Sequence, residues 1–213
     1  SPNPFYQIYE GAALLGGGEI RFANCPAPSF KPDWRSIGEN LWRRTQLVFV
    51  CSPNNPSGSV LQLDDWKELF DLQDKYGFTI ASDECYSEIY FDGEKPIGGL
   101  EAAHKLGRGN KGLVMFTSLS KRSSVPGLRS GFVAGDAEIL SRFLLYRTYH
   151  GSAMGIPVQH ASIAAWNDEQ HVVENRRLYH EKFDRVLPIL QQAFDVKRPD
   201  ASFYIWLKVP GGD

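Results

Sequence analysis

The sequence predicts an α/β protein with a mainly parallel sheet and flanking helices. Short apolar runs, typical of strands that are covered on both faces, alternate along the chain with longer segments of helical periodicity. This alternation indicates right-handed crossovers between parallel strands. Three of the runs end in polar residues, which parallel strands bring to the carboxyl edge of a sheet, where ligands bind. The fold class and a ligand site are therefore predicted together.

Helices are predicted where apolar residues recur at helical spacing. The four segments are residues 5–15, 64–76, 136–149 and 157–192, the last with a break near residues 166–168. Gly16 and Gly77 are expected to end the first two, and Asp64 or Asp65 to cap the second. The second helix is expected to face the core with its large apolar side chains, Trp66, Leu69, Phe70 and Leu72.

Strands are predicted at residues 19–23, 47–51, 78–82, 113–117, 131–134 and 202–209. The run at 47–51 is continuously apolar, and the run at 113–117 is apolar up to its last residue, Thr117, as expected for buried strands. The segment 202–209 alternates in the way that a strand with two different faces does. A Pro-rich loop is expected at residues 25–32.

Composition argues against several classes of function. The chain has 213 residues, of which 42% are apolar, and a net charge of −2. A chain of this length buries about 70% of its unfolded surface, and the balanced charge argues against nucleic-acid or membrane partners. No apolar run approaches the roughly 18 residues of a membrane span. The three cysteines lie far apart without metal-ligand spacing, so no metal site or disulfide framework is predicted. A cytoplasmic location is the simplest expectation.

The ends of the sequence lead us to expect an internal fragment. The chain begins without methionine and enters a helical pattern almost at once, and it stops just after the run at 202–209. More protein is expected on both sides.

Lys121 is the strongest candidate for a reactive residue. It follows the apolar run at 113–117, with Ser118 and Ser120 before it and Arg129 eight residues later. A lysine forms a Schiff base with an aldehyde, and hydroxyl and guanidinium groups hold a phosphate. An aldehyde and a phosphate on one molecule indicate pyridoxal phosphate (PLP) as cofactor. The competing interpretation of a Lys-Arg pair is a solvated surface pair.

Asp83 and Tyr86 follow the next predicted strand. A carboxylate at position 83 would keep the pyridine nitrogen of the cofactor protonated, so that the ring accepts electrons from the substrate. Glu84 points to the other side of the backbone, which favours Asp83 alone. The phenol of Tyr86 would donate to the 3-oxygen of the cofactor. The alternatives are a turn or capping residue for Asp83 and a core aromatic for Tyr86.

Asn55 and Tyr6 complete the predicted site. Asn55 lies in the loop "SPNNPSG" after the run at 47–51, and its amide would donate to the same 3-oxygen. The residues of this loop do not decide which asparagine acts, since Asn, Pro and Gly also cluster in ordinary turns. The ring of Tyr6 would stack on the cofactor, or else simply cover a helix face.

Three motifs in this order resemble the class I/II aminotransferases of PLP fold type I. They are "SPNNPSG", "SDECYSEIY" and "SLSKRSSVPGLRSG". The resemblance implies that Lys121 is the Schiff-base lysine and Asp83 the pyridinium partner. It further implies that Asn55 and Tyr86 contact the 3-oxygen, that Ser118, Ser120 and Arg129 lie at the phosphate, and that Tyr6 is the stacking ring. It also implies cis peptide bonds before Pro4 and Pro56.

Within this family, stretches such as "NPFYQIYEGAALL" and "LLYRTYHG" look most like bacterial succinyldiaminopimelate aminotransferases. That resemblance implies transamination between N-succinyl-LL-2,6-diaminopimelate and 2-oxoglutarate or glutamate in lysine biosynthesis, by a homodimer. It implies a large PLP-binding domain at 1–185, lacking its N-terminal part, and the start of a small domain at 186–213. The phosphate loop and the substrate-carboxylate arginine of the family are absent, so the fold is expected to be incomplete at both ends. The alternatives are another class I/II aminotransferase, a PLP lyase, or a truncated domain that folds or dimerises without cofactor.

Overall fold

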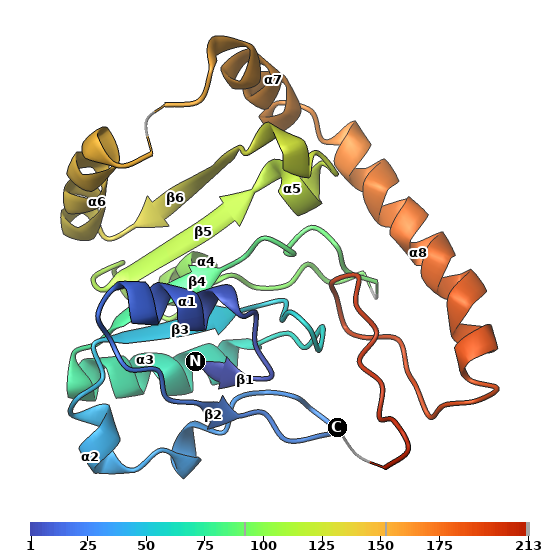
Figure 1. Ribbon diagram of the computed structural model, residues 1–213, viewed down its shortest axis with the longest axis horizontal. Coiled ribbons are helices and arrows are strands. Elements are labelled where there is room, and N and C mark those ends of the chain that lie inside the picture. Colours follow the sequence, from blue (N-terminus) through green and yellow to red (C-terminus); the bar gives the residue numbers. More distant parts are fainter. Residues whose placement is uncertain (92, 152, 212–213) are drawn as a thin grey trace.

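The computed structural model describes residues 1–91, 93–151 and 153–211. Within these residues the centre of the molecule is a four-stranded sheet in the order β3-β4-β5-β6 (Figure 1). The strands are β3 (Leu47–Cys51), β4 (Thr79–Asp83), β5 (Leu113–Ser118) and β6 (Gly131–Gly135). The first three are parallel, and β6 runs antiparallel to β5. The mainly parallel sheet is confirmed, and all four strands begin and end within one residue of the predicted bounds.

The register of the sheet brings the strand ends level. Cys51 pairs with Asp83, and Asp83 pairs with Phe116. Ser118 at the end of β5 pairs with Gly131 at the start of β6. The polar residues that follow β3, β4 and β5 therefore leave the sheet at the same edge.

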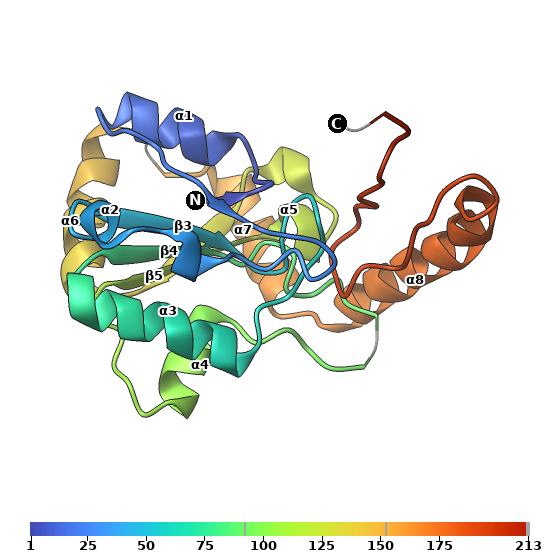
Figure 2. The ribbon, with the colours of Figure 1, turned by 90° about the horizontal axis from the view of Figure 1, so that it is seen from below.

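Helices cover the two faces of the sheet differently. α3 (Leu63–Tyr76) and α4 (Gly99–Lys105) lie on one face, and α1 (Ile8–Leu15) lies on the other (Figure 2). As predicted, Trp66, Leu69 and Phe70 are buried in the core beneath α3, and Leu72 packs against them. Burial of such a side chain contributes about 1.5–3 kcal/mol. The predicted cap of this helix is wrong, because Gln62 is the N-cap and Asp65 completes a capping box from the third helical position.

The segment before β3 contains only short elements. They are β1 (Pro2–Asn3), β2 (Ala23–Asn24), the 3₁₀ turn η1 (Trp34–Ser36) and α2 (Glu39–Trp42). The strand predicted at 19–23 is wrong except at its last residue. Its partner β1 offers only two residues for pairing, Pro2 opposite Ala23 and Asn3 opposite Asn24, so no longer ladder forms there.

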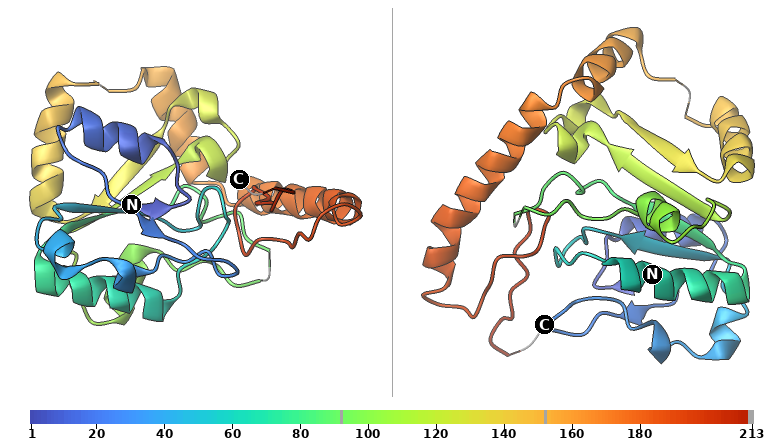
Figure 3. Two further views of the ribbon diagram at one scale, coloured as in Figure 1. Left: turned by 60° about the horizontal axis from the view of Figure 1, so that its bottom comes forward. Right: turned by 180° about the vertical axis from the view of Figure 1, so that it is seen from behind.

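The second half of the chain is mostly helical. Its elements are α5 (Leu119–Arg122), the 3₁₀ turn η2 (Pro126–Leu128), α6 (Ala137–Tyr149), α7 (Ile156–Trp166) and α8 (Gln170–Leu190). The predicted break is confirmed between α7 and α8. Figure 3 shows α8 extending away from the sheet, with the C-terminal segment returning beside it. α8 is continuous across residue 185, and the division at that residue stays a prediction. Among the described helices, none is both long and apolar enough to cross a membrane.

The strand predicted at 202–209 is wrong, although its alternation is real. Phe203, Ile205 and Leu207 pack on a second hydrophobic cluster, which α8 supplies with Phe183 and Leu187. A strand also needs a partner for its backbone groups. In the described chain the only bridge near this segment joins Tyr90 to Ala201.

Candidate active site

The carboxyl edge of the sheet gathers most of the predicted site residues. Asp83 is the last residue of β4, Tyr86 follows three residues later, and Lys121 lies in α5 directly after β5. The Nζ atom of Lys121 is 5.8 Å from the ring centroid of Tyr86 and 4.9 Å from that of Phe203. The rings of Tyr86 and Phe203 contact each other edge-to-face, so the half-buried amine lies beside an aromatic pair at the end of the central strands.

Asp83 is held by two hydrogen bonds. The hydroxyl of Tyr9 donates to its Oδ2 over 2.7 Å, and the backbone N–H of Cys85 donates to its Oδ1 over 3.1 Å. Glu84 turns to the opposite side, where its Oε1 accepts from Ser82 Oγ and from the backbone N–H of Gly99, each over 2.8 Å. The two neighbouring carboxylates therefore have separate surroundings.

Tyr9 is a site residue that the sequence reasoning missed. It is buried in α1, and its ring stacks on Phe49 with 4.9 Å between centroids. Burial raises the pKa of the Tyr9 phenol far above its usual value, and the neighbouring Cys51 and Asp83 raise it further. The phenol therefore stays protonated and donates to Asp83. Its spacing of three residues from Tyr6, one helical turn, was the available signal.

Tyr6 lies two residues before α1, and its ring contacts the ring of Tyr9. Its side chain is exposed, and it meets the ring of Tyr9 edge-to-face with 5.9 Å between centroids. An exposed ring in contact with the aspartate's hydrogen-bond donor is available to cover a bound ligand. The structure therefore brings Tyr6 to the same edge as Asp83.

Tyr86 pairs with a second tyrosine from the C-terminal segment. Its hydroxyl lies 2.8 Å from the hydroxyl of Tyr204. Burial raises the pKa of Tyr86 well above its usual value, and the bond with Tyr204 raises it further. Neither Tyr204 nor its neighbour Phe203 was predicted, because a contact between residues 118 positions apart leaves no local pattern.

The segment around Lys121 is a single turn of helix. Ser118 caps it, since its Oγ accepts from the backbone N–H of Ser120 over 2.9 Å. Within the described residues, no hydrogen-bond partner of Lys121 Nζ is found. Arg129 is exposed in a left-handed conformation (φ 53°), and its guanidinium donates to the carbonyl of Pro126 over 2.7 Å. In the same described part of the chain, no hydrogen bond joins Arg129 to Ser118 or Ser120.

The loop after β3 distinguishes its two asparagines. Asn54 is buried, and its Oδ1 accepts from the backbone N–H of Ser57 over 3.1 Å and from Ser57 Oγ over 2.9 Å. The side chain of Asn55 has no hydrogen bond to the described residues, so its amide remains available. The peptide bonds Asn3–Pro4 and Asn55–Pro56 are cis, as the resemblance implies.

A cavity elsewhere in the molecule does not include this edge. It has a volume of about 480 Å³ and lies between α1, α2 and β3, with Trp34, Trp42 and Val48 among its lining residues. None of the candidate residues lines it. No group of three or more His, Cys, Asp or Glu side chains suited to a metal ion occurs in the described chain.

The donor set at the carboxyl edge fits PLP. It combines a primary amine, a carboxylate with a protonated phenol behind it, a second phenol and the capping hydroxyl of Ser118. These groups match an aldehyde, a basic ring nitrogen, a phenolic oxygen and a phosphate, respectively. This chemistry and the strand-edge geometry point to the same family as the motifs do.

A family model for "Aminotransferase class I and II" matches residues 1–212. The chain belongs to this family. Members of the family depend on PLP. An aminotransferase structure from Neisseria meningitidis is 82% identical and superposes with a TM-score of 0.96, covering all of this chain and 54% of that one.

Two further relatives carry more specific names. An LL-diaminopimelate aminotransferase of Halothermothrix orenii is 33% identical over 99% of this chain and 54% of its own length. A structure from Thermus thermophilus named "probable N-succinyldiaminopimelate aminotransferase" is 25% identical with a TM-score of 0.90, over 100% of this chain and 56% of that one. The chain spans about half the length of the relatives it matches.

Proposed function

We propose that the full-length protein is a PLP-dependent aminotransferase that transfers an amino group between an amino acid and a 2-oxo acid. The observation that supports this most directly is the position of Lys121. Its amine lies at the end of β5 beside the ring of Tyr86, on the sheet edge that also presents Asp83. Membership of the aminotransferase family supports the same reaction.

Each candidate residue has a distinct role in this proposal. Lys121 would hold the cofactor through its aldehyde carbon, and its amine would move a proton to and from the substrate Cα. When bound, PLP supplies a ring that accepts the electrons left at Cα. Asp83 keeps the ring nitrogen protonated, and Tyr9 holds Asp83 in place through its 2.7 Å hydrogen bond.

The remaining residues bind and orient the cofactor. Asn55 and Tyr86 donate to the 3-oxygen, and Tyr6 stacks on the ring and excludes water. The phosphate is held by Ser118, Ser120 and Arg129. The resemblance and the position of these residues around one sheet edge support this assignment.

The finer assignment concerns substrate and assembly. We propose N-succinyl-LL-2,6-diaminopimelate and 2-oxoglutarate or glutamate as substrates, in lysine biosynthesis in the cytoplasm, and a homodimer as the active form. The motif resemblance and the name of the Thermus relative support the succinylated substrate, and the name of the Halothermothrix relative supports a diaminopimelate substrate. The homodimer and the cytoplasmic location rest on the resemblance. We also propose the division into 1–185 and 186–213, which rests on the family resemblance. Amino-donor profiling of the full-length protein distinguishes this substrate from those of other transaminases and of lyases.

Borohydride trapping tests the proposed chemistry. The full-length protein is incubated with PLP and reduced, and the modified lysine is located by mass spectrometry. We expect the cofactor on Lys121 and a visible absorbance band that Lys121→Ala abolishes. Lys111→Ala, which changes an exposed lysine before β5, serves as the control and retains both signals. The proposal is wrong if the wild-type protein gives no adduct at Lys121.

A further inference from the structure

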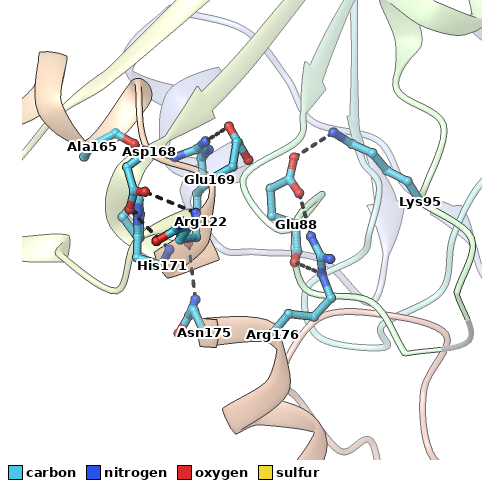
Figure 4. A network of polar contacts seen from close by, with 11 residues as sticks. Glu88, Lys95, Arg122, Ala165, Asp168, Glu169, His171, Asn175 and Arg176 are labelled. Carbon is cyan, nitrogen blue, oxygen red and sulfur yellow. Dashed lines mark hydrogen bonds and ion pairs between the residues drawn. The ribbon is translucent and has the colours of Figure 1, made fainter. Parts of the chain in front are cut away.

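The turn that carries Lys121 is bonded to the α7–α8 region at four consecutive residues. Asn175 contacts the carbonyls of Lys121 and Arg122. The Arg122 guanidinium donates to the carbonyl of Ala165 over 2.9 Å and forms an ion pair with Glu169. Ser123 and Ser124 also bond to this region, through His171 and Asn175 respectively. Figure 4 shows Glu169, His171 and Asn175 close to Arg122 of this turn.

His171 connects Ser123 of this turn to Asp168. His171 Nε2 is 2.8 Å from Ser123 Oγ, and its Nδ1 is 2.5 Å from Asp168 Oδ2. The bond with His171 holds the pKa of the Asp168 carboxyl below its usual range. The chain from Asp168 through His171 to Ser123 thus fixes the end of α5 against the start of α8.

Asn175 bonds directly to the backbone of Lys121. Its Nδ2 donates to the carbonyl oxygens of Lys121 over 3.1 Å and Arg122 over 3.3 Å, and its Oδ1 accepts from Ser124 Oγ over 2.9 Å. Only the nitrogen of an amide can face two carbonyls, so the orientation of the side chain is determined. The last carbonyls of a helix lack partners within it. Asn175 supplies the missing donor to these carbonyls. The one-turn helix is therefore capped by a side chain of α8 at its C-terminal end and by Ser118 at its N-terminal end.

Arg176, the next residue of α8, bonds to the segment that carries Tyr86. Arg176 Nε donates to the carbonyl of Glu88 over 2.9 Å, and its Nη2 is 3.0 Å from Glu88 Oε2. Its guanidinium also lies 4.0 Å from the ring centroid of Tyr90. Glu88 follows Tyr86 by two residues and is bonded to Lys95 over 2.7 Å as well (Figure 4). Asn175 and Arg176 therefore connect the segments that carry Lys121 and Tyr86.

We propose that Asn175 and Arg176 are positioning residues, which together set the place of the Lys121 amine relative to Tyr86. Neither touches the reacting atoms in this arrangement, and both act through backbone that they bond. The inference rests on the proposed aminotransferase function. Displacement of a reacting group by about 1 Å reduces turnover by up to about 100-fold, so loss of Asn175 is expected to affect kcat strongly.

The test compares Asn175→Ala with Ser124→Ala in the full-length, PLP-loaded protein. We expect N175A to lower kcat by about 10- to 100-fold while KM for the amino donor stays within about threefold. The pH midpoint of the cofactor's visible band should also shift, because the surroundings of the lysine amine change. S124A removes the bond to Asn175 Oδ1 but leaves both contacts to the carbonyls, and it should match the wild type in all three readouts.

A second pair of variants keeps the proposal falsifiable. Asn175→Asp, which has the same size but turns oxygen toward the two carbonyls, replaces N175A if that variant does not fold. Arg176→Gln should lower kcat less, and its effect should not add to that of N175A, because both residues brace one distance. Unchanged kcat and band midpoint in a folded Asn175 variant overturn the proposal, even if its melting temperature falls. Failure of the wild type to trap PLP at Lys121 would instead refute the proposed function.

Discussion

Asp83 and Glu84 are adjacent carboxylates with opposite surroundings. Asp83 faces α1 and accepts from the Tyr9 phenol, on the face where the candidate site lies. Glu84 faces α4 and is 9% exposed, with its Oε1 accepting from Ser82 and Gly99. Figure 2 shows the two helices on opposite sides of the sheet. One residue step at the end of β4 thus separates a site carboxylate from one that supports a helix.

The difference shows how the alternation of a strand assigns roles to identical groups. Glu84 is closely enclosed, and a Cβ atom at Gly98 would lie 2.1 Å from its Oε2. Burial raises the pKa of Glu84 above its usual value, although the bonds from Gly99 and Ser82 oppose the shift. Asp83 is only half-buried and keeps a protonated phenol as its donor. A ligand can therefore reach the carboxylate of Asp83, whereas the carboxylate of Glu84 is enclosed.

Exchange of the Asp83 carboxylate for an amide should have the largest effect. Asp83→Asn keeps the shape of the side chain but removes the charge that, in the proposed function, would hold the ring nitrogen protonated. We expect turnover of the full-length protein to fall by about 10²- to 10³-fold, a loss typical of one electrostatic contact to the reacting system. Glu84→Gln is the matched control and should stay within about threefold. Equal losses in the two variants would remove the distinction between the carboxylates.

Removal of the Tyr9 hydroxyl should have a smaller effect, which is a loss of stability through the missing hydrogen bond to Asp83. Tyr9→Phe keeps the ring stacked on Phe49 but removes the hydrogen bond to a charged acceptor, which contributes about 1.5–3 kcal/mol. The free energy of unfolding, from urea titration, should fall by about that amount. Tyr6→Phe leaves the bond to Asp83 intact and should have little effect. If both variants are equally stable, Tyr9 does not hold Asp83.

The smallest expected effect is a change in the pH dependence of the free energy of unfolding when Glu84 is replaced. Because the pKa of Glu84 is raised by burial, the folded protein binds more protons than the unfolded chain above the usual glutamate pKa. Its contribution to stability is therefore present at low pH and is lost as the pH rises through the folded pKa. The free energy of unfolding of Glu84→Gln, minus that of the wild type, should increase from pH 4 toward neutral pH. A difference that decreases with pH would reverse the assigned sign.

The sequence allowed prediction of the parts of this fold that depend on local pattern. The run at Leu47–Cys51 is apolar throughout because both faces of β3 are covered, and its bounds were predicted without error. The spacing of Trp66, Leu69 and Phe70 identified the buried face of α3. The segment 202–209 shows the limit, since its alternation revealed two faces but not whether a neighbouring strand was present.

The positions of the candidate residues in the fold were predictable to a similar extent. Strand ends placed Asp83, Asn55 and Lys121 on one edge, because parallel register follows from the α/β pattern. Tyr9 and Tyr204 were missed because their partners lie 74 and 118 residues away in the sequence. Such contacts depend on how α1 and the C-terminal segment pack, which no spacing rule encodes.

Gly131, which pairs with Ser118, lies where β5 and β6 approach each other closely, next to the turn that carries Lys121. A Cβ atom at Gly131 would lie 2.5 Å from the carbonyl oxygen of Thr117 and 3.3 Å from Cα of Ser118. The backbone torsion of Gly131 is ordinary, so what this position requires is room rather than freedom of rotation. A single added methyl group would push β6 away from β5 at the residue that caps the turn. The lack of a side chain at Gly131 therefore lets β5 and β6 approach each other closely beside the segment that carries Lys121.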